Sequence, residues 1–529
     1  MPLYKRERGT TTRRKEAFRV NKRLTKRLRQ CKQRIRYRLR KKQFKDRPDP
    51  VLSASNIHYD MAGRARGLAY GGIGAMHLLA RRSGLVAAID EKLALLKCHL
   101  PYHESDHVLN IAYNILCNGQ CLEDLERLRN DEVYLDALGA ERIPDPTTAG
   151  DFCRRYTRQD VHTLMDIING VRLRVWSRQP EAFFDEAIID ADGTIAETTG
   201  QCKEGMDISY KGLWGYHPLL ISLANTAEPL YLVNRSGNRT SSDGAALYLD
   251  QAKDLCRQAG FRKILMRGDT DFSQTRHLDR WDTDGTRFIF GINAMRNLES
   301  MAESLPEGLW KPLIRPAGYE VRTQPRHRPD NVREQIVVER RYKNIRLQSE
   351  HVAEFDYRPT KCRKTYRVVV VRKNLSVEQG EEVLFDDVRY FFYITNDLVS
   401  SPATIVRLAN GRCNQENLIE QLKNGVHAMR MPVDNLVSNW AYMVMASLAW
   451  TLKAWFALML PEQGRWSAKY KPEKDSVLTM EFKTFRNAFM LIPCQIVRTG
   501  RKVVYRLLSW NRWLSVLLRA WNALRCSPG

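Results

Sequence analysis

Three acidic residues stand where they could hold two divalent cations. Asp192 closely follows the apolar run 188–189, and Asp269 follows the apolar run 264–266. Both aspartates are therefore expected at the ends of buried strands, where side chains can face a common crevice. Glu416 lies in a segment predicted to be helical. Converging carboxylates suit Mg²⁺, and a pair of such ions promotes in-line phosphoryl transfer, so these residues indicate a nuclease or a DNA transferase.

Two basic residues share the predicted helix with Glu416. Ser401 followed by Pro402 is a helix start signal, and no further proline occurs before Lys423. At about 3.6 residues per turn, a continuous helix places Arg412, Glu416 and Lys423 on one face. We therefore expect Glu416 to bind metal, while the arginine holds a phosphate oxygen through a bidentate fork and the lysine holds one as a point charge.

The three motifs resemble those of the DDE-type transposases of bacterial insertion sequences, in the cut-and-paste branch whose last helix carries Tyr-x2-Arg-x3-Glu-x6-Lys. Arg412, Glu416 and Lys423 fit the last three positions of that signature, whereas Ala409 stands where the family has tyrosine. The role of that tyrosine therefore stays open for this chain.

Four further fragments resemble the insertion-sequence group known as thirteen-eighty, and the resemblance spans roughly residues 60 to 510. These fragments are Gly215-Tyr216-His217-Pro218-Leu219, Gln201, Tyr393-Ile394-Thr395-Asn396 and Leu422-Lys423-Asn424-Gly425.

Neighbouring acids leave alternatives open. Asp192 precedes Gly-Thr and so resembles the Asp-x-Thr of the family, which favours it over Asp190. Glu420 lies one turn beyond Glu416 on nearly the same helix face, and Asp271 follows Asp269 closely. Each motif taken singly also has a structural explanation, because strand-end aspartates often cap turns and helical charge rows are often solvated.

Composition indicates a polyanionic partner. The 529 residues include 85 Lys and Arg against 60 Asp and Glu, a net charge of +25. The first 50 residues alone hold 21 Lys and Arg against four Asp and Glu. We expect this basic, disordered arm to bind DNA in a salt-sensitive manner that is largely independent of sequence. Its candidate DNA-binding residues are Arg23, Arg27, Arg29 and Lys41.

The chain is expected to be α/β, with an RNase H-like core and a mixed sheet, interrupted by a β-rich insertion and flanked by helical regions. The predicted boundaries are 1–50 for the arm, 57–178 for a helical DNA-binding domain, 179–294 and 389–430 for the core, 295–388 for the insertion and 431–529 for a helical C-terminal region. Within the core, strands are predicted at 219–223 and 230–233 and up to Arg267, with helices near 245–259 and from Ser273.

By resemblance, the insertion helps to hold the transposon end, where an aromatic residue can stack on a flipped base. Trp310 and Tyr319 are the candidates, although aromatic residues in β-rich segments more often belong to the core. The apolar stretch 436–452 is too short and polar for a confident membrane span, so a buried helix or an oligomer contact is expected instead.

The resemblance implies a transposase that binds terminal inverted repeats, cuts the DNA ends and joins a 3′-hydroxyl to target DNA. Asp192, Asp269 and Glu416 would hold two Mg²⁺ ions, with Mn²⁺ as a substitute, and a homodimer would act on the two ends. The absence of a secretory signal pattern favours a cytoplasmic protein, and the resemblance implies that it is bacterial and nucleoid-associated. The alternatives are a transposase-derived DNA-binding protein with a decayed site and a metal-dependent nuclease without strand transfer. A glycosidase is a weaker alternative, because the basic charge does not suit a neutral sugar.

Overall fold

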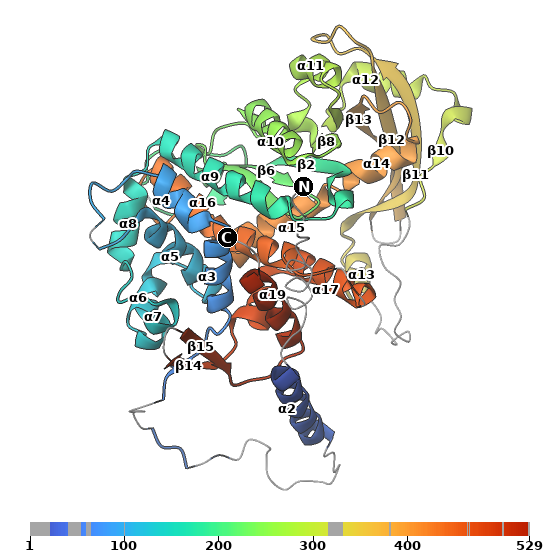
Figure 1. Cartoon of the computed structure of the whole chain (residues 1–529). Coiled ribbons are helices and arrows are strands. Elements are labelled where there is room, and N and C mark those ends of the chain that lie inside the picture. Colours follow the sequence, from blue (N-terminus) through green and yellow to red (C-terminus); the bar gives the residue numbers. More distant parts are fainter. Residues whose placement is uncertain are drawn as a thin grey trace, which may run out of the picture.

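The computed structural model describes residues 22–40, 54, 56–59, 65–99, 101–200, 202–315, 332–379, 382–462, 464, 466–499 and 502–526. In this part of the chain, a nine-stranded mixed sheet with the strand order β10-β11-β12-β13-β9-β8-β2-β6-β7 is packed against helices (Figure 1). Its strands are β2 (Glu186–Gly193), β6 (Leu219–Leu223), β7 (Glu228–Val233), β8 (Lys263–Gly268), β9 (Arg287–Ile292), β10 (Lys311–Pro312), β11 (Lys343–Tyr357), β12 (Tyr366–Gln379) and β13 (Glu382–Thr395). The predicted α/β class with a mixed sheet is confirmed.

Five strands, in the order β7-β6-β2-β8-β9, form the part of the sheet that carries the two aspartates. β7, β6 and β2 pair antiparallel, whereas β2, β8 and β9 pair parallel. Every residue of β6 and β7 is buried, as expected for strands covered on both faces. Helix α10 (Ala245–Ala259) connects β7 to β8, and α11 (Leu278–Thr283) connects β8 to β9. The α-helix predicted from Ser273 therefore begins five residues later, after short 3-10 turns.

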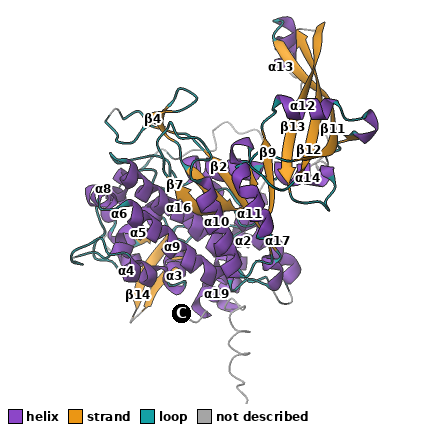
Figure 2. Cartoon of the chain, turned by 90° about the horizontal axis from the view of Figure 1, so that it is seen from above, coloured by secondary structure: helices purple, strands orange, loops and turns teal. Residues whose placement is uncertain are grey.

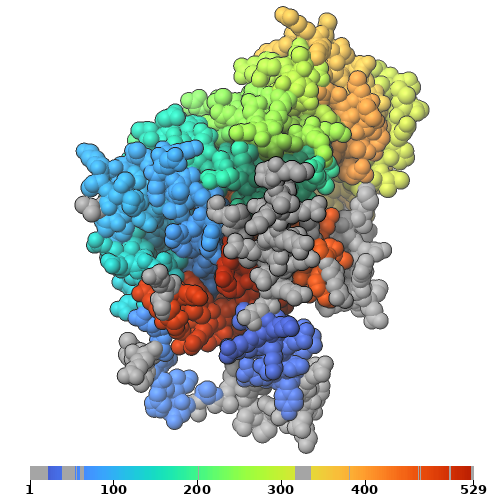
Figure 3. Space-filling model, viewed as in Figure 1, coloured from blue at the N-terminus to red at the C-terminus, as the bar shows by residue number. Residues whose placement is uncertain are grey.

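The long strands β11, β12 and β13 continue the same sheet. β13 pairs antiparallel with β9, and the register places Phe392 opposite Ile292 and Thr395 opposite Ile289. The three strands extend beyond the rest of the sheet and form a projection from the body of the molecule (Figures 2 and 3). The β-rich segment predicted as an insertion thus contributes strands to the central sheet. The same segment contains the helices α12 (Arg296–Glu303) and α13 (Val332–Glu339).

Helix α16 (Leu436–Leu458) lies at the centre of the helical side and packs against β7. The indole groups of Trp440 and Trp450 donate hydrogen bonds of 2.6 Å to the carbonyls of Leu232 and Ala227. This helix is long and apolar enough to cross a membrane, but its apolar window is entirely buried inside the protein. The prediction of a buried helix at 436–452 is therefore confirmed, since α16 packs against the sheet.

Smaller helices surround α16. On the N-terminal side they are α3 (Ile73–Arg82), α4 (Leu85–Lys92), α5 (Glu104–Leu116), α6 (Leu125–Arg129), α7 (Glu132–Leu138), α8 (Pro146–Arg154) and α9 (Arg158–Trp176). On the C-terminal side they are α17 (Ser467–Thr479), α18 (Phe482–Phe485) and α19 (Leu514–Cys526). A small sheet of β1 (Gly67–Leu68), β14 (Cys494–Thr499) and β15 (Lys502–Leu507) joins the two ends of the described body. Helix α2 (Lys22–Arg40) lies below this body in Figure 1.

A fully buried carboxylate ties the helices to the sheet. Glu228, at the start of β7, accepts a hydrogen bond of 3.0 Å from Arg172 Nε. The indoles of Trp176 and Trp455 donate to the same carboxylate at 3.0 Å and 2.9 Å, and the hydroxyl of Thr226 donates at 2.6 Å. Because both charges are paired and hydrogen-bonded, their burial is tolerated, and α9, α16 and β7 are held in a defined arrangement.

Candidate active site

Asp192 and Asp269 lie at one edge of the sheet. Asp192 is the penultimate residue of β2, and Asp269 immediately follows β8, the parallel neighbour of β2. The register pairs Asp190 with Arg267, so the two strands end almost together. Asp269 also caps the following 3-10 turn, because its carboxylate accepts a 3.0 Å hydrogen bond from the backbone N–H of Asp271. The predicted strand-end positions therefore bring these two carboxylates into one region.

A single guanidinium group lies between the two aspartates. Nη1 of Arg412 is 3.4 Å from Oδ2 of Asp192 and 3.8 Å from Oδ2 of Asp269. All three side chains are at most partly exposed. Arg412 thus acts as a shared counter-ion for the pair.

Glu416 lies four residues after Arg412, in the first turn of α15 (Cys413–Glu420). Its neighbour Gln415 is buried and anchors this helix to β6, because its Oε1 accepts from the hydroxyl of Ser222 and its Nε2 donates to the carbonyl of Leu220 at 3.3 Å. Leu220 is the β-sheet partner of Asp192. Gln415 therefore fixes α15 beside the strand pair, with Glu416 close enough for its charge to act on Asp192.

The predicted continuous helix over 402–423 is wrong. The segment is divided into α14 (Pro402–Asn410), α15 and a π-helical turn at Gln421–Gly425. The break falls at Gly411, where a Cβ atom would lie 2.6 Å from Nη1 of Arg267. Arg412 therefore stands at the N-terminal cap of α15, and its position is set by this turn instead of by uninterrupted helical periodicity.

Lys423 lies in the π-helical turn, apart from the Arg412 contact. Burial lowers the pKa of Lys423. The negative charges of Glu420 and Glu197 oppose this effect, and the positive charge of Lys211 adds to it. The side chain of Glu420 accepts a 2.7 Å hydrogen bond from Asn424. The structure therefore groups Asp192, Asp269, Arg412 and Glu416, and it places Lys423 and Glu420 in an adjacent group.

The electrostatics of the site reflect several negative charges around one cation. Burial raises the pKa of Asp192 to about 7; Arg412 opposes the rise, and Asp269 and Glu416 add to it. Burial also raises the pKa of Asp269, and Arg412 again opposes the rise. A bound divalent cation would favour the charged form of both groups.

The chemistry of these donors fits Mg²⁺ or Mn²⁺, because carboxylate oxygens are the hard ligands that such ions prefer. Across the described part of the chain, no three His, Cys, Asp or Glu side chains already form a group able to hold a metal ion. The guanidinium of Arg412 lies between the two carboxylates, near one oxygen of each.

Asp190 is held in a different way from Asp192. Both of its oxygens accept hydrogen bonds of 2.7 Å from Arg267, and both residues are almost completely buried. Residues two apart on a strand share a face, so the backbone pattern alone does not distinguish Asp190 from Asp192. The distinction comes from Arg267, which lies two residues before Asp269 and belongs to none of the predicted site motifs.

The remaining predicted residues lie in several places. Arg23, Arg27 and Arg29 lie on exposed positions of α2, whereas Lys41 and Tyr319 fall outside the described residues. Trp310 is buried, and the guanidinium of Arg372 lies 4.3 Å from the centre of its ring. Trp310 therefore packs in the core in this structure and presents no open face to a base.

Three further residues are Ala409, on the helix before Arg412, and Tyr393 and His217, which lie near the site. Ala409 lies on α14 and packs against the apolar cluster beneath it. Burial raises the pKa of Tyr393, on β13, and the nearby Arg412 opposes the rise. Nδ1 of His217 donates a 2.7 Å hydrogen bond to the carbonyl of Arg239. Burial lowers the pKa of His217, and the charge of Asp271 opposes this effect. Both residues belong to the fragments that resemble the insertion-sequence group, but long-range packing places them at the site, since they do not adjoin the acids in the sequence.

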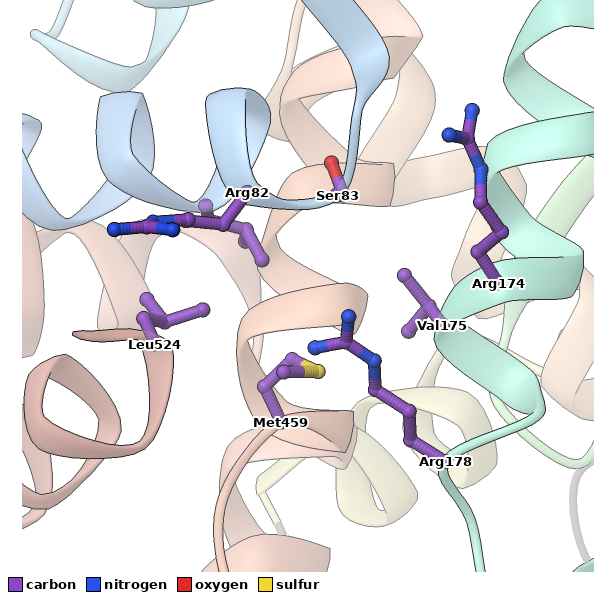
Figure 4. A pocket seen from close by; sticks show the side chains of 8 residues that line it. Arg82, Ser83, Arg174, Val175, Arg178, Met459 and Leu524 are labelled. Carbon is purple, nitrogen blue, oxygen red and sulfur yellow. The ribbon is translucent and has the colours of Figure 1, made fainter. Parts of the chain in front are cut away.

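A hollow on the helical side is separate from the acids (Figure 4). Arg82, Arg174 and Arg178 line it together with apolar residues such as Met459, and its lining includes no carboxylate. It is therefore unsuited to hold a divalent cation.

Comparisons with known proteins bear on the whole chain. A family model described as "Transposase DDE domain group 1" matches residues 50–528. No curated protein matches the chain. Among solved structures, the cryo-EM structure of a piggyBac transposase synaptic complex with hairpin DNA is similar, with a TM-score of 0.36 and 11% sequence identity over 79% of this chain and 79% of that chain.

Proposed function

Because the chain belongs to the family of group 1 DDE transposase domains, we propose that it cuts the DNA ends of an insertion sequence and joins the 3′-hydroxyl to target DNA. The observation that carries this proposal is the arrangement of Asp192 and Asp269 around Arg412, with Glu416 close enough to act on Asp192. This arrangement combines metal-binding carboxylates with a cation suited to phosphate.

The strand order supports an RNase H-like core. Three antiparallel strands, β7, β6 and β2, continue into the parallel strands β8 and β9, with helices between them. The two aspartates lie at the ends of the adjacent strands β2 and β8, as the resemblance to bacterial insertion-sequence transposases implies.

Asp192, Asp269 and Glu416 are the proposed metal ligands, with Mg²⁺ or Mn²⁺ as the ions. When bound, the metals would supply activation of the attacking oxygen and neutralisation of charge on the leaving oxygen. The pairing of Asp190 with Arg267 supports Asp192 as the ligand, and the contact of Glu420 with Asn424 supports Glu416.

The other residues would act on the DNA strand. Arg412 would orient the scissile phosphate and stabilise its developing charge. Lys423 would hold a phosphate farther along the strand as a point charge. Arg23, Arg27 and Arg29 on α2 would bind the DNA backbone, and two protomers would act on the two ends.

The test is divalent-metal-dependent cleavage and joining of the DNA that flanks this gene. Asp192→Asn, Asp269→Asn and Glu416→Gln are each expected to abolish both reactions while DNA binding is retained. Glu420→Gln is the matched control for Glu416→Gln, since it neutralises an acid one turn away, and it should keep activity.

The alternatives give different results. A wild-type protein that binds this DNA but never cuts it would be a DNA-binding protein with a decayed site. A protein that cuts but does not join a pre-cut 3′-hydroxyl end would be a nuclease. Activity that survives any one of the three substitutions would remove that residue from the proposed metal ligands.

A further inference from the structure

A short hairpin beside the acids exposes two aromatic side chains. It consists of β4 (Asp207–Ile208) and β5 (Trp214–Tyr216), and it stands out from the body of the molecule (Figure 2). Tyr210 is 75% exposed and Trp214 is 53% exposed. Ile208, which pairs with Trp214 across the hairpin, is 47% exposed. Neighbouring exposed apolar groups of this size commonly mark a binding surface.

The hairpin is held in place by its own turn and by the core. Gly212 adopts a φ of 73° in the turn. The carbonyl of the buried Ser209 accepts a 2.9 Å hydrogen bond from the N–H of Gly212. The hydroxyl of Tyr216 donates to the carbonyl of Glu204 at 2.8 Å. The turn at Gly237 packs so closely on the hairpin that a Cβ there would meet the carbonyls of Asp207 and Gly215. The exposed rings therefore project from a fixed support.

This support adjoins the catalytic acids. β5 pairs with β3 (Ala196–Glu197), which begins four residues after Asp192. The ring of Tyr210 lies 6.2 Å from the ring of His217, measured between centroids. Nε2 of His217 lies 2.9 Å from the position that a Cβ would take on Gly193, the residue after Asp192. The side chain of His217 therefore lies between Tyr210 and the backbone beside Asp192.

Positive charge accompanies the aromatic rings. Nζ of Lys211 lies 5.5 Å from the centre of the Tyr210 ring, and its charge also acts on Lys423. Exposed aromatic faces next to lysines are the combination that binds unpaired nucleobases, because the rings stack on bases while the ammonium groups contact the phosphates.

We propose that Tyr210 and Trp214 stack on unpaired bases of the DNA end at the site of cleavage, with Lys211 contacting the adjoining phosphate. This inference rests on the proposed function, and it names the hairpin as the part that receives the end. It assigns the stacking role to an exposed pair on β4–β5, whereas the predicted candidate Trp310 is buried beneath Arg372.

The experiment measures binding by the full chain to two duplexes made from the DNA that flanks this gene, one fully paired and one with unpaired terminal bases. Tyr210→Ala and Trp214→Ala should each weaken binding to the unpaired end by roughly 5- to 150-fold, the range for loss of one base stack. Binding to the fully paired duplex should change much less. Tyr210→Phe and Trp214→Phe keep a ring and should restore the preference. Leu247→Ala, which removes an exposed apolar side chain on α10, is the control and should leave the preference intact.

A second measurement locates the contact. Unpaired terminal bases carrying 5-iodouracil should photo-crosslink to Tyr210 or Trp214, as identified by mass spectrometry. Alanine variants that bind both duplexes like the wild type, or crosslinks that form only elsewhere, would overturn the proposal. It would also be overturned if the variants changed only the oligomeric state, which would make the hairpin a protein contact.

The outcome is separable from that of the proposed function, because binding and crosslinking do not require cleavage. A wild type that prefers unpaired ends through this hairpin but never cuts them would refute the transposase activity and support the hairpin. A wild type that cuts and joins ends with no contribution from Tyr210 or Trp214 would do the reverse.

Discussion

Arg267 donates two hydrogen bonds to Asp190, from Nε to Oδ1 and from Nη2 to Oδ2, each 2.7 Å long. Its third nitrogen, Nη1, donates to the carbonyl of Leu408 at 2.7 Å. Asp190 lies on β2, Arg267 on β8 and Leu408 near the end of α14, so this buried pair joins the strand of Asp192, the strand that leads to Asp269 and the helix that precedes Arg412. The position of the candidate site therefore depends on an ion pair that is not expected to contact substrate.

The first prediction concerns this pair. Asp190→Asn leaves Arg267 buried without its counter-charge, so the free energy of unfolding should fall by about 3–5 kcal/mol. Urea unfolding at neutral pH measures the change. Asp192→Asn is the matched control two residues along the strand, and because burial raises the pKa of Asp192, its neutral amide should leave stability unchanged or slightly higher. Equal losses in the two variants would contradict the distinction between these aspartates.

The second prediction concerns Arg412. Arg412→Gln should lower the single-turnover rate of DNA cleavage by about 10²–10³-fold, because a preorganised cation at the phosphate is removed. Affinity for Mn²⁺ should be equal or higher, because the guanidinium no longer stands between Asp192 and Asp269. Arg407→Gln, an exposed arginine on α14, is the control. A parallel loss of metal binding and cleavage in Arg412→Gln would mean that the arginine organises the ligands.

The third prediction concerns pH and Lys453 on α16. Burial lowers the pKa of this lysine to about 7, while its Nζ donates to the carbonyl of Leu478 at 2.7 Å. Above about pH 7 the folded protein releases a proton that the unfolded chain keeps until about pH 10.4, so this residue makes stability rise with pH across that window. The slope approaches about 1.4 kcal/mol per pH unit. Its contribution below pH 7 is constant and unfavourable.

Lys453→Met should remove that slope. The variant should be more stable than the wild type at pH 7, and the difference should shrink as the pH approaches 10. Denaturant unfolding of both proteins from pH 6 to 10 provides the comparison, and other titrating groups cancel because they are shared. A difference in stability that does not change with pH would show that Lys453 keeps its proton in the folded protein.

The fourth prediction concerns α2. Replacing Arg23, Arg27 and Arg29 together with glutamine should weaken binding to all DNA sequences alike and make it less sensitive to salt. The slope of log K against log salt should become shallower by roughly 0.9 for each phosphate that the variant no longer neutralises. Binding titrations at several salt concentrations measure this slope. Arg506→Gln, an exposed arginine on β15, serves as the control and should leave the slope unchanged.

The local pattern of the chain predicted much of the fold. The strand predicted at 219–223 coincides with β6, the helix near 245–259 coincides with α10, and the apolar runs before Asp192 and Asp269 form β2 and β8. These elements are encoded by short-range periodicity and by their end signals, which are visible in a single sequence. The acidic residues at strand ends follow directly from those elements.

Tertiary structure decided which side chains meet at the site. The sequence by itself determined that Asp192 and Asp269 stand at the ends of buried strands and that Glu416 lies on a helix, whereas the pairing of β2 with β8 came from the tertiary structure. The sequence did not determine the break at Gly411, where Arg267 from β8 leaves no room for a Cβ atom, nor the burial of Trp310 beneath Arg372. It also did not determine the exposure of Tyr210 and Trp214 beside His217. These relationships join residues far apart in the chain, and packing and buried ion pairs specify such contacts only when the whole fold has formed.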